Sequence, residues 1–280
     1  MTVRDFLALA GERLDHAGIE DPRFEALLIL EEAAGTGRAA ALAHPEEELD
    51  AGQAARCEEL LGRREQGEPM AYLTGRQEFM GLEFHVGPAV LIPRADTETL
   101  AEEALRHLHD GMRILDLCTG SGAVALSLLH YSNDTTAMAT DIDAAALAAA
   151  GENAAALGLA ERVRFSETDL FPPEAEREAY DLITANPPYI PTGEIGSLMR
   201  DVRDHEPRIA LDGGADGLAF YRRITAQAPA WLHNDGWLLV EIGYDQGESV
   251  RRMFEEAGFH AVEVVQDLGG HDRVVKGCYY

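Results

Sequence analysis

From Met112 to the C-terminus, short apolar runs alternate with longer segments of helical periodicity. Continuously apolar runs indicate strands buried on both faces, as parallel strands connected by crossover helices are. The alternation therefore predicts an α/β domain, with an open, mostly parallel sheet covered by helices on both faces. The predicted strands cover residues 112–118, 136–142, 162–169, 180–186, 237–243, 260–268 and 272–280. The predicted helices cover residues 123–131, 144–158, 218–236 and 246–258.

Before this region the chain changes character twice. The first segment, up to about residue 68, has apolar residues at helical spacing, and Asp21-Pro22 has the residue types of a helix N-cap and first turn. The later segment RQEFMGLEFHV alternates around Gly81 and predicts a β-hairpin, followed by a helix capped by Asp96. We therefore expect a helical module for docking or stability at residues 1–70, a hairpin linker at 71–95 and the α/β domain at 96–280.

Charge, hydropathy and cysteine content argue against several classes of partner and site. The formal net charge is −27 and Lys276 is the only lysine, so the surface repels a nucleic-acid backbone unless its arginines cluster. No apolar stretch is long enough to span a membrane and the N-terminus lacks a signal-peptide pattern, so we expect a cytoplasmic protein. Cys57, Cys118 and Cys278 are far apart and odd in number, which argues against a disulfide framework and a zinc site.

A glycine-rich loop, DLCTGSG at residues 116–122, follows the first predicted strand. In doubly wound sheets, ligands bind beyond the carboxyl ends of the strands, and Gly120 and Gly122 allow the backbone to approach one closely. Taken alone, the loop fits a tight connection equally well. Asp141 ends the next strand, where an acid can bind the two ribose hydroxyls of a nucleotide. Asp143 is expected to cap the following helix, and Asp169 either contacts an adenine edge or is an exposed loop residue.

The fourth predicted strand ends in Asn-Pro-Pro-Tyr, residues 186–189. Asn186 supplies an amide, Pro187 and Pro188 hold nearby backbone carbonyls at fixed φ, and Tyr189 supplies an aromatic face. Two acceptors and a ring suit a planar NH2 group. Pro-Pro alone is as consistent with a turn that ends the strand, but cofactor-type features at the ends of three other strands favour a binding site.

These motifs resemble those of class I S-adenosylmethionine-dependent methyltransferases that act on a planar nitrogen. Four further stretches are similar to the HemK/PrmC family, whose members methylate the glutamine of the GGQ motif in peptide-chain release factors. The stretches are PMAYLTGRQEFMGLEFHVGPAVLIPRADTE, HEPRIALDGGADGLAFYRRI, LLVEIGYDQG and DLGGHDRVVKG. The resemblance implies a Rossmann-like sheet with an antiparallel last strand, S-adenosylmethionine as cofactor and a release factor as protein partner.

The resemblance also implies roles for individual residues. The side-chain oxygen of Asn186 and the carbonyl of Pro187 would accept the two amide hydrogens of the substrate, while Tyr189 packs on the amide plane. Catalysis is thus expected from Asn186, Pro187 and Tyr189, and substrate binding from these residues with Pro188. Glu98 either shapes the substrate pocket or favours the helix start through the macrodipole. The cofactor would contact Cys118, Thr119, Gly120, Ser121, Gly122, Asp141, Asp169, Leu170 and Asn186.

The sequence departs from the family at two places. Cys118 stands where the family usually has glycine, and a positive φ there would strain it. A related glutamine methyltransferase of a large-subunit ribosomal protein carries CTGSG at this place, so cysteine is tolerated. The family's IPRPETE reads IPRADTE here.

Three other functions stay open. The ribosomal-protein glutamine methyltransferase has the same chemistry and another partner. A nucleic-acid amino-methyltransferase acting on adenine N6 would need a basic groove, which this acidic chain does not show. A non-catalytic scaffold would have no use for an intact Asn-Pro-Pro-Tyr motif. We expect a monomer with no metal, no membrane and no direct nucleic-acid contact.

Overall fold

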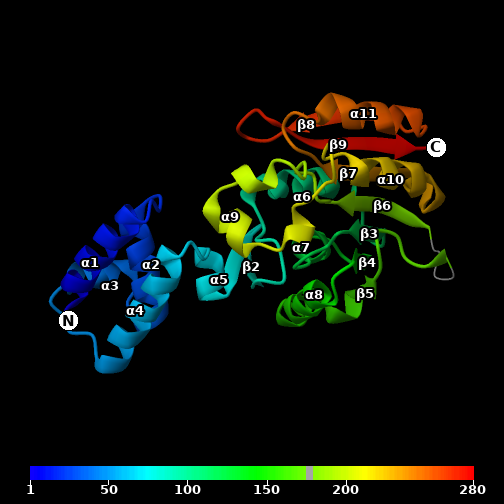
Figure 1. Ribbon diagram of the computed structural model, residues 1–280. Coiled ribbons are helices and arrows are strands. Elements are labelled where there is room, and N and C mark those ends of the chain that lie inside the picture. The colour runs from blue at the N-terminus through cyan, green and yellow to red at the C-terminus, as the bar shows by residue number, and fades with distance from the viewer. Residues whose placement is uncertain (175–178) are drawn as a thin grey trace. The chain divides into compact units, whose positions relative to one another are not determined.

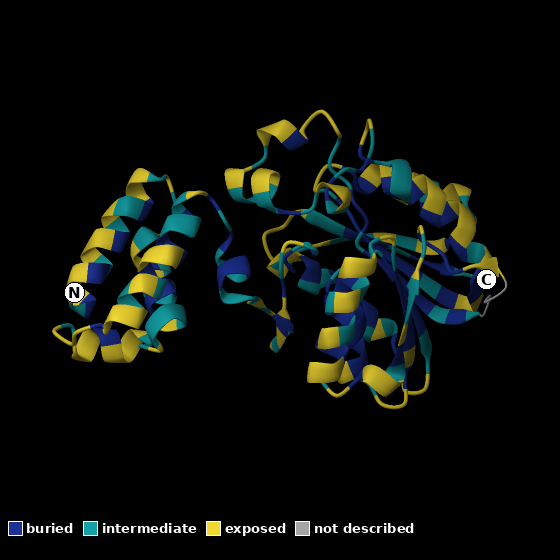
Figure 2. Ribbon diagram, turned by 60° about the horizontal axis from the view of Figure 1, so that its bottom comes forward, coloured by how far each residue is buried: buried dark blue, intermediate teal, exposed yellow. Residues whose placement is uncertain are grey.

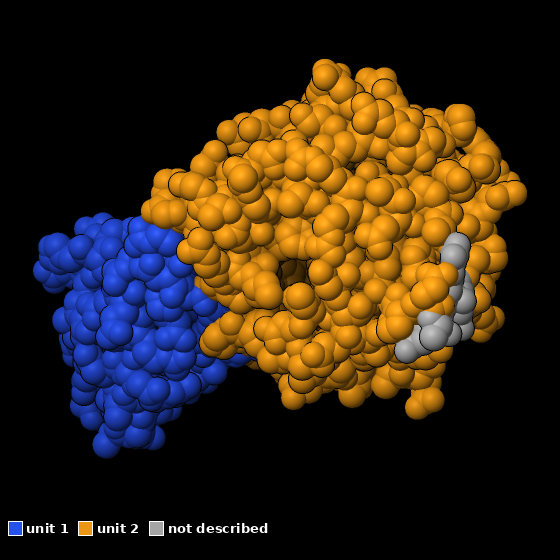
Figure 3. All heavy atoms as spheres, turned by 45° about the vertical axis from the view of Figure 1, so that its right-hand side comes forward, with its two compact units in different colours: residues 1–75, 199–205 blue, residues 76–198, 206–280 orange. Residues whose placement is uncertain are grey.

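The computed structural model describes residues 1–174 and 179–280. The chain divides into two compact units, coloured separately in Figure 3. The helical unit comprises residues 1–75 and 199–205, and the sheet unit comprises residues 76–198 and 206–280. The helical unit is therefore built from two separate stretches of sequence.

The helical unit is held together by amphipathic helices. Its helices are α1 (Val3–His16), α2 (Pro22–Ala34), α3 (Arg38–Ala43), α4 (Ala51–Glu65), α5 (Met70–Thr74) and α9 (Arg200–His205). Thr2 forms a capping box with Asp5 at the start of α1, and Asp50 forms one with Gln53 at the start of α4. α1, α2 and α4 pack on one another around fully buried apolar residues, among them Phe6, Ile29 and Leu60.

α9 packs within this unit through two side chains. Arg200 lies over Gly67, where its Cδ atom is 3.2 Å from the position of an added Cβ. Its Nη1 atom donates to the Glu65 carbonyl at 3.3 Å, and the Nε2 atom of His205 lies 3.3 Å from the Gln66 carbonyl oxygen. The C-terminal end of α4 and α9 therefore pack together.

The sheet unit begins with the predicted hairpin, β1 (Arg76–Phe79) and β2 (Leu82–His85), which pair antiparallel. The turn residues Met80 and Gly81 have φ of 53° and 71°, which is typical of the turns favoured in two-residue hairpins. The Met80 amide donates to Oε1 of Glu98 at 2.6 Å, and the Tyr131 hydroxyl donates to the Met80 carbonyl at 2.6 Å. Glu98 thus anchors the hairpin turn.

The large sheet confirms the α/β prediction (Figure 1). Over the described residues its order is β5-β4-β3-β6-β7-β9-β8, with only β9 running antiparallel to its neighbours. Its strands are β3 (Arg113–Leu117), β4 (Thr136–Asp141), β5 (Val163–Glu167), β6 (Tyr180–Ala185), β7 (Leu232–Glu241), β8 (His260–Gln266) and β9 (Asp272–Tyr279). The chain reverses its direction of winding at β3, so a crevice is expected at the carboxyl ends of β3, β4 and β6.

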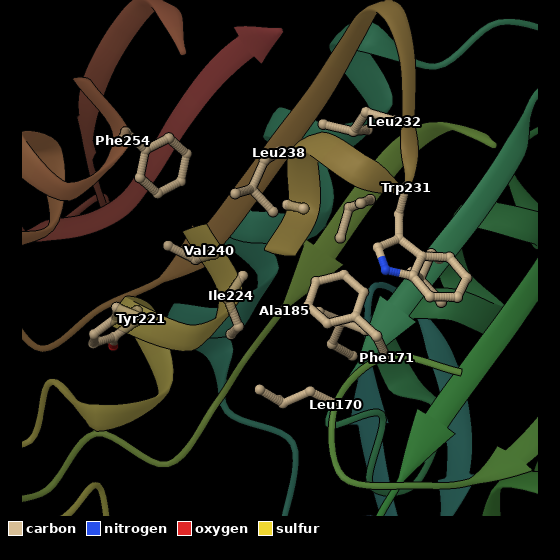
Figure 4. Close-up of a cluster of buried hydrophobic side chains, with 14 of the residues drawn as sticks. Leu170, Phe171, Ala185, Tyr221, Ile224, Trp231, Leu232, Leu238, Val240 and Phe254 are labelled. Carbon is tan, nitrogen blue, oxygen red and sulfur yellow. The ribbon is translucent and has the colours of Figure 1, made fainter. Parts of the chain in front are cut away.

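Helices cover the sheet, and the central strands are buried, as Figure 2 shows. The covering helices are α6 (Ala95–His107), α7 (Ala123–His130), α8 (Ala144–Ala156), α10 (Ala219–Gln227) and α11 (Gly247–Glu256). Because side chains alternate along a strand, Leu238 and Val240 of β7 join a core with Ile224 of α10 and Phe254 of α11 (Figure 4). Trp237, on the opposite face of β7, stacks on His107 of α6 with ring centroids 3.8 Å apart.

Two sequence predictions about helix ends were wrong. The helix expected at residues 218–236 ends at Gln227, and β7 begins at Leu232 rather than at Trp237. Pro229 has no amide hydrogen to continue the helix, and a short 3-10 turn at Ala228–Ala230 follows instead. Asp96 does not cap α6, because the helix begins one residue earlier at Ala95 and Arg94 takes the N-cap position.

Asp21 occupies the predicted N-cap position of α2, with Pro22 in the first turn, but its side chain makes no capping hydrogen bond. Its backbone is left-handed, with φ of 49°. Across residues 1–174 and 179–280, every helix falls short of the length and apolar character needed to cross a bilayer.

Candidate active site

Two backbone hydrogen bonds hold the loop after β3, one to β4 and one within the loop. The Thr119 amide donates to the Thr140 carbonyl at 2.9 Å, and the Gly122 amide donates to the Thr119 carbonyl at 2.8 Å. Cys118, Gly120 and Gly122 all have positive φ, of 57°, 54° and 81°. Cys118 therefore adopts a left-handed conformation that costs about 1–2 kcal/mol for a residue with a Cβ.

The Asp116 side chain links this loop to β6 by hydrogen bonds. Its carboxylate accepts one hydrogen bond from the Thr119 hydroxyl and one from the Thr184 hydroxyl of β6, both at 2.6 Å. The side chain is buried, and burial raises the pKa of the Asp116 carboxyl to about 6 in spite of these two donors. A buried acid that bonds both neighbouring segments holds the ends of β3 and β6 together.

Asp141 is held in a defined orientation at the end of β4. Its Oδ2 atom accepts the Gly120 amide at 2.9 Å, and its Oδ1 atom accepts the Asp143 amide at 3.0 Å. Each carboxylate oxygen thus keeps acceptor capacity for a ligand hydroxyl. Burial raises the pKa of the Asp141 carboxyl. Asp143 caps α8 as predicted, because its side chain accepts the Ala145 amide at 2.8 Å.

Asp169 and Leu170 follow β5 with different surroundings. Asp169 is exposed and forms an ion pair with Arg223 of α10 at 2.7 Å. Leu170 is buried at the edge of the core in Figure 4 and has φ of 75°. Its carbonyl accepts the Thr140 hydroxyl at 2.6 Å. The backbone of this turn is therefore tied to β4.

The Asn-Pro-Pro-Tyr segment begins where β6 ends. The Nδ2 atom of Asn186 donates to the Thr97 hydroxyl of α6 at 3.3 Å. Among the hydrogen bonds of the described residues, none engages Oδ1 of Asn186 or the Pro187 carbonyl. The Tyr189 hydroxyl donates to Oε1 of Glu241 at 3.3 Å, and its ring packs against the core.

A second loop, residues 211–217, lies directly against this segment. The Ile190 amide donates to the Leu211 carbonyl at 3.0 Å, and the Gly213 amide donates to the Ile190 carbonyl at 2.8 Å. A Cβ added to Gly213 would lie 2.7 Å from the Tyr189 Cα atom, and one added to Gly217 would lie 2.3 Å from the Tyr189 carbonyl oxygen. Both positions therefore require glycine.

These segments line one cavity of about 1080 Å³, its open mouth included. The predicted site residues on its wall are Cys118, Thr119, Gly120, Ser121, Asp141, Asp169, Leu170, Asn186 and Pro188. Three others do not line it: Gly122, Pro187 and Tyr189. An added Cβ at Gly122 would meet Leu126 and Ala150, so this glycine allows helix packing instead. The cavity is therefore formed by four of the strand ends that the sequence singled out, with Gly122 behind its wall.

Comparison with known proteins matches both parts of the chain. Residues 5–75 match the PrmC N-terminal domain family, and residues 95–200 match the methyltransferase small domain family. A release factor glutamine methyltransferase from Moorella thermoacetica is 46% identical over 276 residues, covering 98% of this chain and 97% of that protein. The protein of that name from Geobacter sulfurreducens is 41% identical, covering 99% and 96%.

The chain belongs to the release factor glutamine methyltransferase family. This confirms the family that the motifs indicated. It also confirms the predicted enzyme class, a methyltransferase. A solved methyltransferase from Pyrococcus furiosus shares the fold, with a TM-score of 0.53, 16% identity and coverage of 71% of this chain and 90% of that one. The predicted class I fold is thus confirmed, and the predicted antiparallel last strand is β9, the last strand along the chain.

Several residues that shape this family member's site were missed by reasoning from the sequence. Arg94, Pro207 and Phe220 line the cavity, and the Gln246 side chain donates to the Tyr189 carbonyl at 3.0 Å. Arg94 pairs with the buried Glu206, which also accepts the Ile92 amide at 3.2 Å. The glycine-rich DGGADG stretch was a visible signal for the second loop, but its contact with Tyr189 is tertiary.

Proposed function

We propose that this protein transfers a methyl group from S-adenosylmethionine to the side-chain amide nitrogen, N5, of the glutamine in the GGQ motif of a release factor. Family membership supports the reaction and the substrate class. The observation that carries the proposal is the Asn186 amide on the cavity wall, with its NH2 end on Thr97 and its oxygen unengaged among the described hydrogen bonds. That oxygen is an acceptor for a substrate NH2 group.

The cavity fits the proposed cofactor. Bound S-adenosylmethionine supplies an electrophilic methyl group on a sulfonium sulfur. Asp141 retains acceptor capacity on both carboxylate oxygens, which matches a pair of ribose hydroxyls. The loop from Cys118 to Ser121 would hold the methionine part, and Asp169 with Leu170 would flank the adenine.

The chain's own groups act mainly by positioning. The nitrogen of a glutamine amide is a weak nucleophile because its lone pair is delocalised into the carbonyl. Oδ1 of Asn186, on the cavity wall, would accept one amide hydrogen and aim the lone pair at the methyl group. The Pro187 carbonyl, the second acceptor that the family resemblance implies, would have to reach the amide from a residue that does not line the cavity. Pro188, on the wall, would bound the amide plane, and Tyr189, off the wall, would act through its packing next to Pro188. The N-methylated amide is strongly acidic before it loses its proton, so water suffices as the acceptor.

The partner is proposed to be a protein. A net charge of −27 opposes binding to a nucleic-acid backbone, which disfavours adenine in DNA as substrate. Labelled S-adenosylmethionine, incubated in turn with a release factor, a large-subunit ribosomal protein and DNA, separates the candidate substrates. Label is expected in the release factor, and absent from a release factor whose GGQ glutamine is replaced.

Asn186→Ala tests the site directly. We expect turnover to fall by at least about 100-fold, which is the usual effect of removing one positioned hydrogen-bonding group from an active site. The affinity for the cofactor should stay within about twofold of the wild-type value. Asn133→Ala is the matched control, because Asn133 is an exposed loop residue whose side-chain amide donates to the Asp110 carboxylate at 3.3 Å. Near-normal methyl transfer by Asn186→Ala would refute the assigned site.

A further inference from the structure

The side-chain amide of Gln246 joins the Asn-Pro-Pro-Tyr segment to the second loop. Its Nε2 atom donates to the Tyr189 carbonyl at 3.0 Å and to the Gly217 carbonyl at 3.4 Å. Its Oε1 atom accepts the Gly243 amide at 2.9 Å and lies 3.3 Å from the hydroxyl of Tyr221 on α10. Both ends of one amide are therefore engaged, and they connect segments that are far apart in the sequence.

The partners determine which way this amide faces. A backbone carbonyl can only accept a hydrogen bond, and a backbone N–H can only donate one. The carbonyls of Tyr189 and Gly217 therefore require the NH2 end of Gln246, and the Gly243 amide requires its oxygen. Gln246 is only 8% exposed, so water does not compete freely for these bonds. A glutamine supplies the donor and the acceptor together, which an apolar side chain cannot do.

Two glycines leave room for this amide. A Cβ added to Gly217 would lie 2.7 Å from Nε2 of Gln246 and 2.3 Å from the Tyr189 carbonyl oxygen. One added to Gly243 would lie 3.1 Å from Oε1 of Gln246. Ordinary contacts of a Cβ atom begin at 3.4 Å, so the backbone can approach Gln246 this closely only where it carries no side chain.

The backbone of the Asn-Pro-Pro-Tyr segment has few other hydrogen bonds. Pro187 and Pro188 have no amide hydrogen, so neither can donate one. Among the hydrogen bonds of the described residues, the backbone of residues 187–189 makes only the bond from Gln246 to the Tyr189 carbonyl. The next backbone bonds are those of Ile190 with the second loop. The segment is therefore held at this point by a side chain and not by the sheet.

We propose that Gln246 is a positioning residue for methyl transfer, which holds the Tyr189 carbonyl and, through it, the backbone of Pro187 and Pro188. This inference rests on the proposed function for its effect on turnover, whereas the hold on Tyr189 is a property of the enzyme alone. Pro188 lies on the cavity wall, while Gln246 and Tyr189 do not line the cavity. Gln246 thus acts on the wall through the segment and not by touching the cofactor or the substrate.

Gln246→Met tests the effect on turnover. Methionine keeps the length of the side chain and removes both ends of the amide. We expect kcat to fall by about 10- to 100-fold, because a misplacement of about 1 Å in an active site has effects of this size. The Kd for S-adenosylmethionine should stay within about twofold, because neither Gln246 nor Tyr189 lines the cavity. A purely structural role would instead lower the midpoint of urea unfolding and leave the kcat of the folded enzyme unchanged.

Gln227→Met is the matched control. The Gln227 side chain also donates to a backbone carbonyl, that of Arg223 at 3.2 Å. It is exposed at the last residue of α10 and does not line the cavity. The same substitution there should keep the wild-type kcat.

Gly217→Ala disturbs the same bond from the other side, because its Cβ would meet both Nε2 of Gln246 and the Tyr189 carbonyl oxygen. Combined with Gln246→Met, it should lower kcat little more than the more damaging of the two changes does alone. Such non-additivity is expected of residues that act through one contact. Losses that multiply in the double variant would show that Gln246 does not act through the Tyr189 carbonyl, and would overturn the inference.

Hydrogen exchange in the wild-type protein tests the hold itself, followed by nuclear magnetic resonance. The side-chain NH2 hydrogens of Gln246 should exchange with water at least about tenfold more slowly than those of Gln227, because they are bonded and buried. Equal exchange at the two residues, or a wild-type kcat in folded Gln246→Met, would overturn the inference. Absence of methyl transfer to a release factor by the wild-type protein, with slow exchange at Gln246, would instead count against the proposed function.

Discussion

Replacing Gly213 by alanine is expected to displace the Asn-Pro-Pro-Tyr backbone. The added Cβ would lie 2.7 Å from the Cα of Tyr189, 2.8 Å from its carbonyl carbon and 2.9 Å from the Pro188 carbonyl oxygen. Ordinary contact begins at 3.4 Å, so one of the two loops must move by about 0.7 Å. All three neighbours are backbone atoms, which cannot turn aside as a flexible side chain can.

The expected effects follow from the size of that movement. A misplacement of about 1 Å in an active site can cost about 100-fold in rate, so turnover should fall by about 10- to 100-fold. Overpacking should lower the free energy of unfolding by about 1–3 kcal/mol. Affinity for S-adenosylmethionine should stay within about twofold, because Gly213 is not on the cavity wall.

Gly214→Ala supplies the control in the same loop. Gly214 has φ of 88°, so alanine there is strained by about 1–2 kcal/mol, but its Cβ would meet only the Ala219 Cβ atom, at 3.2 Å. We expect this variant to lose stability and keep turnover. The assay is kcat for methyl transfer to a release factor, beside urea unfolding and calorimetric binding of the cofactor. Equal turnover in the two variants would show that the Gly213 contact does not position Tyr189.

Three further changes test other parts of the site. Asp141→Ala should weaken S-adenosylmethionine binding by about tenfold or more in calorimetry, and unchanged affinity would remove its role as ribose acceptor. The free energy of unfolding of Cys118→Gly should exceed that of Cys118→Ala by up to about 1 kcal/mol, because glycine adopts the positive φ without strain. The greater entropy of the unfolded glycine chain offsets part of this gain. A glycine variant less stable than the alanine variant would argue against strain at this position. Burial raises the folded-state pKa of Asp116 from 3.8 to about 6, so the folded chain binds this proton more tightly and stability falls as the pH rises from about 4 to about 6. Urea unfolding should therefore show Asp116→Asn gaining about 3 kcal/mol on the wild type between pH 4 and pH 7, and a constant difference would contradict the raised pKa.

The strands and the motifs at their ends were predictable because their signals are local. Continuous apolar runs identified the strands, and DLCTGSG, Asp141 and Asn-Pro-Pro-Tyr each follow one directly. The family usually has glycine at the position of Cys118, which raised the question of a positive φ there. The structure answers it, because Cys118 has φ of 57°.

What escaped prediction depends on contacts between distant segments. Thr97 and Glu241 are unremarkable in the sequence and meet Asn186 and Tyr189 only because β6 and β7 are neighbours under α6. The end of α10 was misjudged because the apolar periodicity continues past Gln227 and hides the effect of Pro229. Helix starts are similarly uncertain by one residue, which is why Asp96 was taken for a cap.

The composition of the helical unit has a consequence for synthesis. Its residues 1–75 leave the ribosome first, but residues 199–205, which carry α9, follow only after β3, β4, β5 and β6 have been made. The helical unit therefore cannot be completed by α9 until more than half of the chain has been translated. A truncation at Gly75 would release a fragment without α9 and leave α9 on a remainder that lacks Gly67 and Glu65.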